Sequence, residues 1–525
     1  MVNVEVVIGL LAAVALLGAL AQRVGLPYPT VLVLGGLLIG VVPGVPAVRL
    51  DPNLVLFGLL PPLVYASSFR ASGFDLRPSV PHILTLAVGL VVFTLAAVAL
   101  VGHYVAGLPW VAAFVLGALV APTDPVSASA IVRRVGAPER IVAILEGESL
   151  VNDGTGLAAF QVAVAAAAGG FSIGHGILEF VAISLGGLAI GLGVGGVVVV
   201  LRRRIDDLEI EIVLGLVAAF GSYTAAQAAG CSGVLAAVAA GLYVGLHAED
   251  ISSPEVRLRS EPFWDALSYL LESVLFLLIG LQFLLIARHL PGPSAWTPIG
   301  EAAAVLAAAV LLRFAWMFTF ARALSLLGRA IPARVERLHP AELTVLGWSG
   351  MRGALSLAGA LSIPLLAAGR AFPARDQVIF LVYAVVLGTL IVPSLTLERL
   401  VRRLGLAQSL RLRDQELEAR TRVARAALDR LDALTGSDRE AEAEAGLGHL
   451  RTLYELRLAR LEARDHALGP AAGDAHGDRL ASARRELLGA ERRALEDMRA
   501  ERRLASEVLA AVAHDLDLDE ARLRR

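Results

Sequence analysis

Long apolar runs recur through the first 400 residues and constrain the fold more than any other feature. A transmembrane helix needs about 20 apolar residues, because the hydrocarbon core of a bilayer is about 30 Å thick. Windows of this kind predict an all-α polytopic membrane protein, in agreement with 56% hydrophobic residues and a mean hydropathy of +0.69. About thirteen spans are predicted, at residues 4–21, 30–46, 52–68, 80–102, 109–131, 140–168, 172–201, 208–226, 230–247, 263–287, 297–324, 343–366 and 376–398.

The charged residues divide the chain into two predicted domains, a transmembrane domain at 1–400 and a tail at 401–525. The tail holds 24 of the 46 Lys and Arg residues and 24 of the 48 Asp and Glu residues. Its Arg and Glu residues at i, i+3 and i+4 spacing predict solvated helices. The tail is either a hairpin that regulates or dimerises the transmembrane domain, or a solvated extension without a ligand.

The arginines between the predicted spans set the orientation, because short cytoplasmic loops collect positive charge. Alternate loops hold 15 arginines, against 4 in the intervening loops. With an odd number of spans, this bias predicts an N-terminus outside and a cytoplasmic tail, in the plasma (inner) membrane. The first apolar run has neither a basic n-region nor a small-residue cleavage site, so we expect it to be retained as a span.

The stretch LEGESLVNDGTG (145–156) places three carboxylates inside one apolar run. A charged side chain at mid-membrane costs about 2.5–3.5 kcal/mol on insertion scales, which favours a functional interpretation. Ser149 and Asp153 share one helix face and offer two oxygen ligands to a cation, while Glu148 and Asn152 share a neighbouring face. One buried carboxylate can hold a proton or a small cation, and coupled exchange follows if each state can face both sides.

Two predicted spans contain helix-breaking residues. The fifth contains APTDP (121–125), in which two prolines remove amide donors, and the twelfth has four glycines within 347–364. Interrupted helices in corresponding parts of two halves indicate a transporter site near the membrane midplane. The freed backbone at Thr123 offers hard oxygens to a sodium-like ion. Asp124 is either a further ligand or the cap of the following half-helix.

Arg352 lies in the middle of the twelfth predicted span, where it needs an acidic partner. Glu148 is the expected partner and Glu146 the alternative. Because breaking a buried pair costs about 3–5 kcal/mol, we interpret Glu148 and Arg352 as a scaffold rather than as ion carriers. Other polar residues at membrane depth either line the cavity or, as we favour, hold helices together: Glu272, Gln282 and Arg313.

Several chemistries are not indicated by the sequence. It has no Gly-rich phosphate loop followed by Lys and Ser or Thr, so coupling to ATP hydrolysis is not expected. No other feature of the sequence indicates an enzyme. The single Cys231 forms no intrachain disulfide and no thiolate metal site. We expect no cofactor and no nucleic-acid partner, and a membrane lipid environment.

Three segments together resemble the monovalent cation/proton antiporters of the NhaP and eukaryotic sodium/proton exchanger branch. They are APTDPVSASAIV (121–132), LEGESLVNDGTG (145–156) and GWSGMRGALSLA (347–358). The resemblance covers about residues 5–400, and the chain from about Ala483 resembles the cytoplasmic C-termini of bacterial members. It implies a thirteen-span homodimer in which an inverted-repeat core with two crossed, broken helices moves against a dimerisation domain.

The resemblance also implies roles for individual residues. It assigns Asp153 as the carboxylate that binds cation and proton, and Asn152 before it resembles the electroneutral branch, which exchanges one cation for one proton. Many relatives carry a Glu in the third span after a Pro-Pro pair, whereas here the residues that follow Pro61-Pro62 include Ala66 and no carboxylate. One expected ligand is therefore missing. The other implied site residues are Ser149, Thr123 and Asp124, with Glu148 and Arg352 as the structural ion pair.

The sequence therefore predicts an electroneutral sodium/proton antiporter driven by the proton gradient. The nearest alternative is an antiporter of the same design that exchanges potassium, or several monovalent cations, for protons. Two further alternatives are an organic-solute transporter of similar fold and an ion sensor that binds without flux and signals through its tail.

Overall fold

The computed structural model describes residues 4–43, 51–70, 80–167, 173–205, 207–248, 254–287, 296–327, 338–367 and 369–407, together with Arg425, Leu428, Glu455 and Leu458. The chain divides into two compact units, residues 1–409 and 410–525. Only the four isolated residues of the second unit are described. The helices predicted for the tail otherwise lie outside the described residues.

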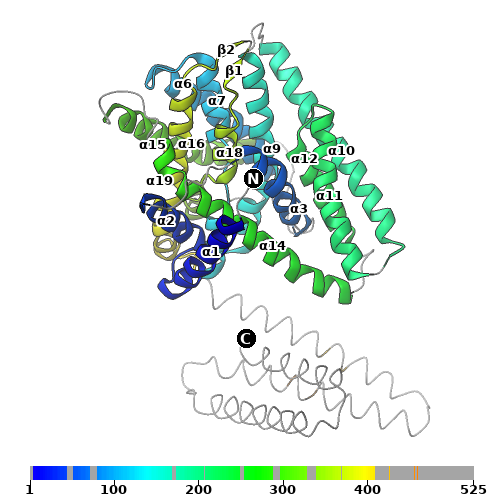
Figure 1. Cartoon of the computed structure of the whole chain (residues 1–525). Coiled ribbons are helices and arrows are strands. Elements are labelled where there is room, and N and C mark those ends of the chain that lie inside the picture. Colours follow the sequence, from blue (N-terminus) through cyan, green and yellow to red (C-terminus); the bar gives the residue numbers. More distant parts are fainter. Residues whose placement is uncertain are drawn as a thin grey trace, which may run out of the picture. The chain divides into compact units, whose positions relative to one another are not determined.

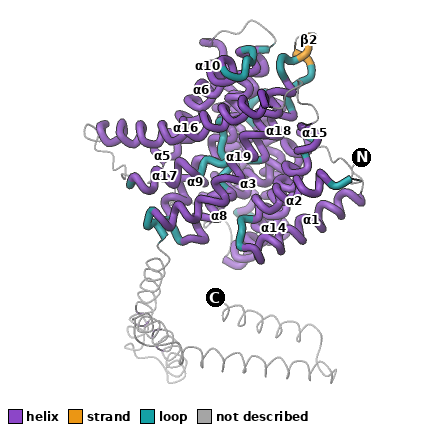
Figure 2. Tube along the Cα trace, turned by 90° about the vertical axis from the view of Figure 1, so that its left-hand side faces the viewer, coloured by secondary structure: helices purple, strands orange, loops and turns teal. Residues whose placement is uncertain are grey.

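Helices make up nearly all of the described part of the first unit, which confirms the predicted all-α fold (Figures 1 and 2). The first half contains α1 (Val4–Val24), α2 (Tyr28–Val41), η1 (Leu54–Leu59), α3 (Leu60–Arg70), α5 (Val80–Leu84), η3 (Thr85–Leu90), α6 (Val91–Tyr104), α7 (Trp110–Val120), α8 (Val126–Val135), α9 (Glu139–Ala166) and α10 (Ile173–Arg202). The second half contains α11 (Leu208–Ala228), α12 (Gly233–Leu246), α14 (Pro254–Leu281), α15 (Phe283–Ala287), α16 (Trp296–Leu327), α17 (Pro340–Trp348), α18 (Ala354–Leu361) and α19 (Arg375–Arg403). Within the described ranges, β structure is limited to the short antiparallel pair β1 (Leu366–Ala367) and β2 (Arg370–Ala371).

Seven of the described helical stretches are long and apolar enough to cross a membrane: Glu5–Val24, Val80–Tyr104, Gly174–Arg202, Leu208–Ala228, Pro262–Leu281, Thr297–Phe320 and Arg375–Arg403. Shorter apolar helices lie at Tyr28–Val41, Leu54–Arg70, Trp110–Val120 and Gly233–Leu246. Each of the predicted windows coincides with one helix or with consecutive helices. Length and composition do not determine how many of these helices cross the membrane, so the count of thirteen spans stays a prediction.

Two groups of helices pack closely within the first unit. In Figure 1, α10, α11 and α12 lie side by side, and α3 packs against α12. Small residues permit this approach, as at Gly191 of α10, where a methyl group would overlap the backbone of Ala236 in α12. The other group surrounds α7 and α9 and includes α6, α18 and α19. The broken helices belong to this second group.

Candidate functional site

Two unwound segments meet in the interior of the first unit. The helix interrupted by the two prolines appears as α7 and α8, separated by residues 121–125, and the glycine-rich one as α17 and α18, separated by 349–353. The backbone N–H of Asp124 donates to the carbonyl of Met351 at 2.8 Å, so the two breaks touch. Because irregular backbone persists at membrane depth only where protein or a water-filled cavity covers it, each segment protects the other.

Arg352 lies at the ends of two half-helices. Its Nε donates to the carbonyl of Val120, the last residue of α7, at 3.0 Å, and its Nη1 donates to the carbonyl of Gly350 at 2.5 Å. Its backbone N–H donates to Thr389 Oγ1 of α19 at 3.1 Å. A cation near helix C-termini offsets their partial negative charge. The guanidinium therefore stabilises the crossing through backbone carbonyls.

Asp124 lies at the opposite kind of helix end. Its Oδ1 accepts a hydrogen bond from the backbone N–H of Val126, the first residue of α8, at 3.0 Å. A Cβ atom on Gly353, which precedes α18, would overlap the Asp124 carboxylate, so the carboxylate also lies against the start of that helix. Anions are favourable at helix N-termini. Of the two roles considered for Asp124, capping is the one with a hydrogen bond, and the side chain also reaches the cavity described below.

The predicted pairing of Glu148 with Arg352 is wrong. Glu148 Oε1 and Oε2 instead accept hydrogen bonds from Nη1 and Nη2 of Arg313 in α16, at 2.5 and 2.8 Å. Both side chains are almost fully buried, and Nε of Arg313 donates to the carbonyl of Leu346 at 3.0 Å. The alternative partner Glu146 is half-exposed and pairs with Arg133 at 2.8 Å. The scaffold pair therefore joins α9 to α16.

Asn152 and Thr123 tie this pair to the unwound segment. The Thr123 hydroxyl donates to Glu148 Oε1 at 2.8 Å and accepts from Asn152 Nδ2 at 2.9 Å. The same Nδ2 donates to the backbone carbonyl of Thr123 at 3.2 Å. Asn152 is fully buried, and its Oδ1 has no partner among the described residues. These contacts fix α9 against the break between α7 and α8.

A cavity of about 120 Å³ lies beside the crossing. It brings together four of the predicted site residues, Thr123, Asp124, Ser149 and Asp153, and adds Glu272 of α14. None of the described residues that line it is basic. Its other lining residues are Leu60, Leu63, Val64, Ser67, Pro122, Pro125, Val126, Leu150, Leu275, Phe276, Gly353, Ala354, Leu355 and Ser356.

The three carboxylates of the cavity differ in their partners. Asp124 accepts the N–H of Val126, and Glu272 Oε2 accepts the hydroxyl of Tyr28 at 2.6 Å. Asp153 forms no hydrogen bond or ion pair with any other described residue. A carboxyl group away from bulk water is stable only if it is protonated, or if a cation or hydrogen-bond donors compensate its negative charge. Asp153 is therefore the cavity carboxylate that has no donor from the described residues and is most open to a ligand.

Two charged residues within apolar runs have more specific positions than their sequence context predicts. The sequence favours interhelical contacts for Arg313 and Glu272, with cavity lining as the alternative. In the structure Arg313 is the interhelical partner of Glu148, and Glu272 lines the cavity. The sequence does mark both residues, because a charged side chain inside an apolar run indicates a specific partner or a functional site. Third-span Ala66 is buried and does not line the cavity, whereas its neighbour Ser67 does.

A helical membrane protein with crossed, broken helices and an acidic cavity at the crossing has the architecture of a secondary ion transporter. The family model described as "Sodium/hydrogen exchanger, transmembrane" matches residues 9–403. The chain belongs to this family.

Relatives and a solved structure agree with this assignment. An uncharacterized Na(+)/H(+) exchanger of Mycobacterium tuberculosis is 33% identical, covering 99% of this chain and 96% of that protein. The Na(+)/H(+) antiporter ApNhaP of Aphanothece halophytica is 32% identical over 84% of this chain and 81% of its own length. The structure of the sodium proton antiporter MjNhaP1 from Methanocaldococcus jannaschii superposes with a TM-score of 0.59 at 20% identity, covering 77% of this chain and 98% of that one. The fold is thus the antiporter fold, and the protein is a monovalent cation/proton antiporter of the bacterial NhaP type.

Proposed function

We propose that the protein exchanges one sodium ion for one proton across the plasma membrane, and that the two compete for Asp153. The observation that carries this proposal is the partner-free carboxylate of Asp153 in a cavity with other oxygen atoms but no basic lining residue among those described. Ser149, one helical turn earlier, and the unwound backbone at Thr123 supply the uncharged oxygens. Hard oxygen ligands are those that alkali cations prefer.

The electroneutral stoichiometry is supported by the partners of the carboxylates at the site. Glu148 is balanced by Arg313, Asp124 caps α8, Glu272 accepts the Tyr28 hydroxyl, and residue 152 is a neutral asparagine. Asp153 is the one cavity carboxylate without a hydrogen-bond donor among the described residues, and it binds either one proton or one monovalent cation. A cycle that swaps them moves no net charge, so its rate is expected to be independent of the membrane potential.

The cavity volume supports a small substrate. At about 120 Å³ it is smaller than the 300–1,000 Å³ typical of sites for drug-sized molecules, which disfavours the organic-solute alternative. Potassium remains the main rival to sodium. A relative from Bacillus subtilis, 31% identical over 71% of this chain and 57% of its own length, is named a sodium, potassium, lithium and rubidium/H(+) antiporter.

The proposal is tested by reconstituting the protein into liposomes with an imposed pH gradient. Adding sodium, potassium or lithium at clamped membrane potential is expected to dissipate the gradient with wild type and not with Asp153→Asn. Glu146→Gln is the matched control, since it removes a carboxylate from the same helix outside the cavity. Exchange by Asp153→Asn would remove that residue from the mechanism. Ion binding without flux in verified wild-type proteoliposomes would favour the sensor alternative.

The arrangement in the membrane is also part of the proposal. We infer an outside N-terminus, a cytoplasmic tail and a homodimer. The arginine distribution supports the orientation. The dimer rests on the family resemblance.

A further inference from the structure

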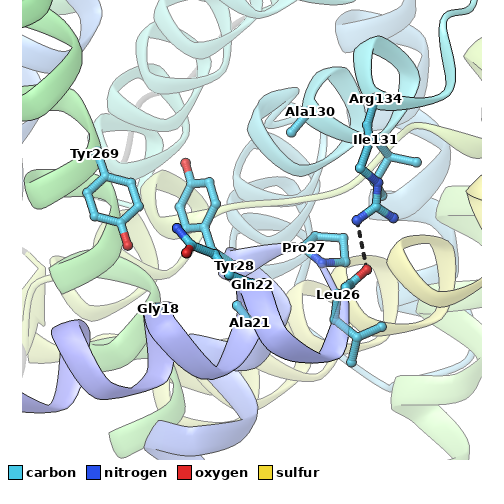
Figure 3. Close-up of a pocket in the computed structure, with 11 residues that line it drawn as sticks. Gly18, Ala21, Gln22, Leu26, Pro27, Tyr28, Ala130, Ile131, Arg134 and Tyr269 are labelled. Carbon is cyan, nitrogen blue, oxygen red and sulfur yellow. Dashed lines mark hydrogen bonds between the residues drawn. The ribbon is translucent and has the colours of Figure 1, made fainter. Parts of the chain in front are cut away.

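Figure 3 shows a second cavity, of about 260 Å³. It is formed by the end of α1, the start of α2, α8 and α14. Arg134 lines it and donates to the carbonyl of Gly25 at 2.7 Å. Arg134 lies in the last turn of α8, next to the Arg-rich loop, so in the proposed orientation this cavity lies toward the cytoplasmic side.

One hydrogen bond joins the walls of the two cavities. Tyr28 lines the second cavity, where its ring lies 5.2 Å from the ring of Tyr269, centroid to centroid (Figure 3). Its hydroxyl donates to Oε2 of Glu272 at 2.6 Å, and Glu272 lines the cavity that contains Asp153. An ion that moves from one cavity to the other through this wall therefore passes the Tyr28–Glu272 contact.

Glu272 is suited to bind a cation at this point. Its Oε1 forms no hydrogen bond with a described residue, so that oxygen is available while Oε2 holds the Tyr28 hydroxyl. Glu272 of α14 lines the same cavity as Asp124 and Asp153, so the cavity holds three carboxylates and no basic residue among the described residues that line it. A cleft lined by charges of one sign raises the local counter-ion concentration.

We propose that Glu272 is a cation-positioning residue on the path between the two cavities, with the Tyr28 hydroxyl as its exchangeable partner. This inference rests on the proposed cation exchange at Asp153. An arriving cation binds Oε1 of Glu272, and the Tyr28 hydroxyl releases Oε2 when the ion needs both oxygens. The ion then moves to the oxygens of Asp124 and Asp153. No covalent step is involved.

The opposite interpretation is that Tyr28 and Glu272 form a brace between α2 and α14. The two interpretations separate because Glu272→Gln keeps a hydrogen-bond acceptor but loses the charge, whereas Tyr28→Phe keeps the charge but loses the hydrogen bond. Glu272→Asp keeps the charge on a shorter side chain. Glu301→Gln is the control, since Glu301 accepts a comparable hydrogen bond from Gln377 at 2.9 Å and lines neither cavity.

The experiment measures sodium-dependent exchange in proteoliposomes, repeated with potassium, and compares the apparent KM with the maximal rate. Charge focusing changes the local ion concentration by about 10–1,000-fold. Glu272→Gln is therefore expected to raise the apparent KM at least about tenfold, while the maximal rate changes by less than about twofold. Tyr28→Phe is expected to leave the apparent KM within about twofold of the wild-type value or to lower it. The apparent KM of Glu272→Asp is expected to stay within about threefold of wild type, and that of Glu301→Gln to equal it.

Two results would overturn the inference. The first is an apparent KM in Glu272→Gln equal to that of wild type. The second is a loss of exchange activity in Tyr28→Phe and Glu272→Asp that equals or exceeds the loss in Glu272→Gln, which is the result expected if the contact only braces the helices. If Glu272→Gln fails to fold, Tyr28→Phe and Glu272→Asp still decide between the two roles. Wild type that exchanges no cation would instead refute the proposed function. The two failures are therefore distinguishable.

Discussion

Replacing Arg313 by methionine tests the buried ion pair between α16 and α9 directly. The variant leaves Glu148 buried, with its hydrogen bond from Thr123 but without the two from Arg313. Removing one partner of a buried pair costs about 3–5 kcal/mol. With an unfolding entropy of about 2.1 cal/mol/K per residue over about 400 residues, this cost lowers the unfolding midpoint by about 4–6 °C.

The double variant Arg313→Met/Glu148→Gln is expected to recover most of this loss. It removes both charges, and replacing a buried pair by neutral groups is often nearly neutral for stability. The glutamine oxygen can still accept the hydrogen bond from Thr123. A double-mutant cycle should therefore give a coupling energy of about 2–3 kcal/mol between Glu148 and Arg313.

Arg352→Met supplies the matched control, because Arg352 is equally buried but donates to backbone carbonyls. Leaving those carbonyls without a donor costs about 1–3 kcal/mol, and Glu148→Gln should not relieve that cost. The assay is thermal unfolding of purified protein in detergent, followed by the fluorescence of the five tryptophans. Rescue of Arg352→Met by Glu148→Gln, without rescue of Arg313→Met, would refute the observed pairing and restore the one predicted from sequence.

Two further predictions concern the crossing and the topology. Gly353→Ala should reduce exchange strongly, because the added methyl group overlaps the Asp124 carboxylate, whereas Gly221→Ala, with nothing within 4 Å of the added atom, should behave as wild type in the same liposome assay. After the single native cysteine is replaced by serine, an impermeant maleimide should label Arg204→Cys only from the cytoplasm and Arg370→Cys only from outside. Labelling of both from one side would contradict the predicted orientation.

The sequence alone predicted the parts of the fold that depend on local chemistry. The two prolines placed the first helix break at residues 121–125, and the glycine-rich run 347–364 contains the second break, at 349–353. Backbone without amide donors or without side-chain restraint interrupts a regular helix more easily. The helical period placed Ser149 and Asp153 on one face, and both line the cavity. That they bind the ion stays a prediction.

The partner of Glu148 could not be found in the same way. Two mid-span arginines were available, and only the packing of α16 beside α17 decides which one reaches α9. Glu148 and Arg313 are 165 residues apart in sequence. Residue spacing along one helix contains no information on such a contact. The same holds for Glu272, whose position in the cavity depends on where α14 lies relative to α3 and α18.

The observed partners give the crossing a charge balance that does not depend on Asp153. Arg313 neutralises Glu148, Arg352 offsets the carbonyl end of α7, and Asp124 offsets the amide end of α8. Had Arg352 been committed to Glu148, the carbonyl end of α7 would have lacked this donor. Because the scaffold is already balanced, the charge on Asp153 can change during a transport cycle without destabilising the two broken helices. Asp153→Asn should accordingly unfold at a midpoint within about 2 °C of wild type, whereas a loss as large as that of Arg313→Met would mean that Asp153 belongs to the scaffold.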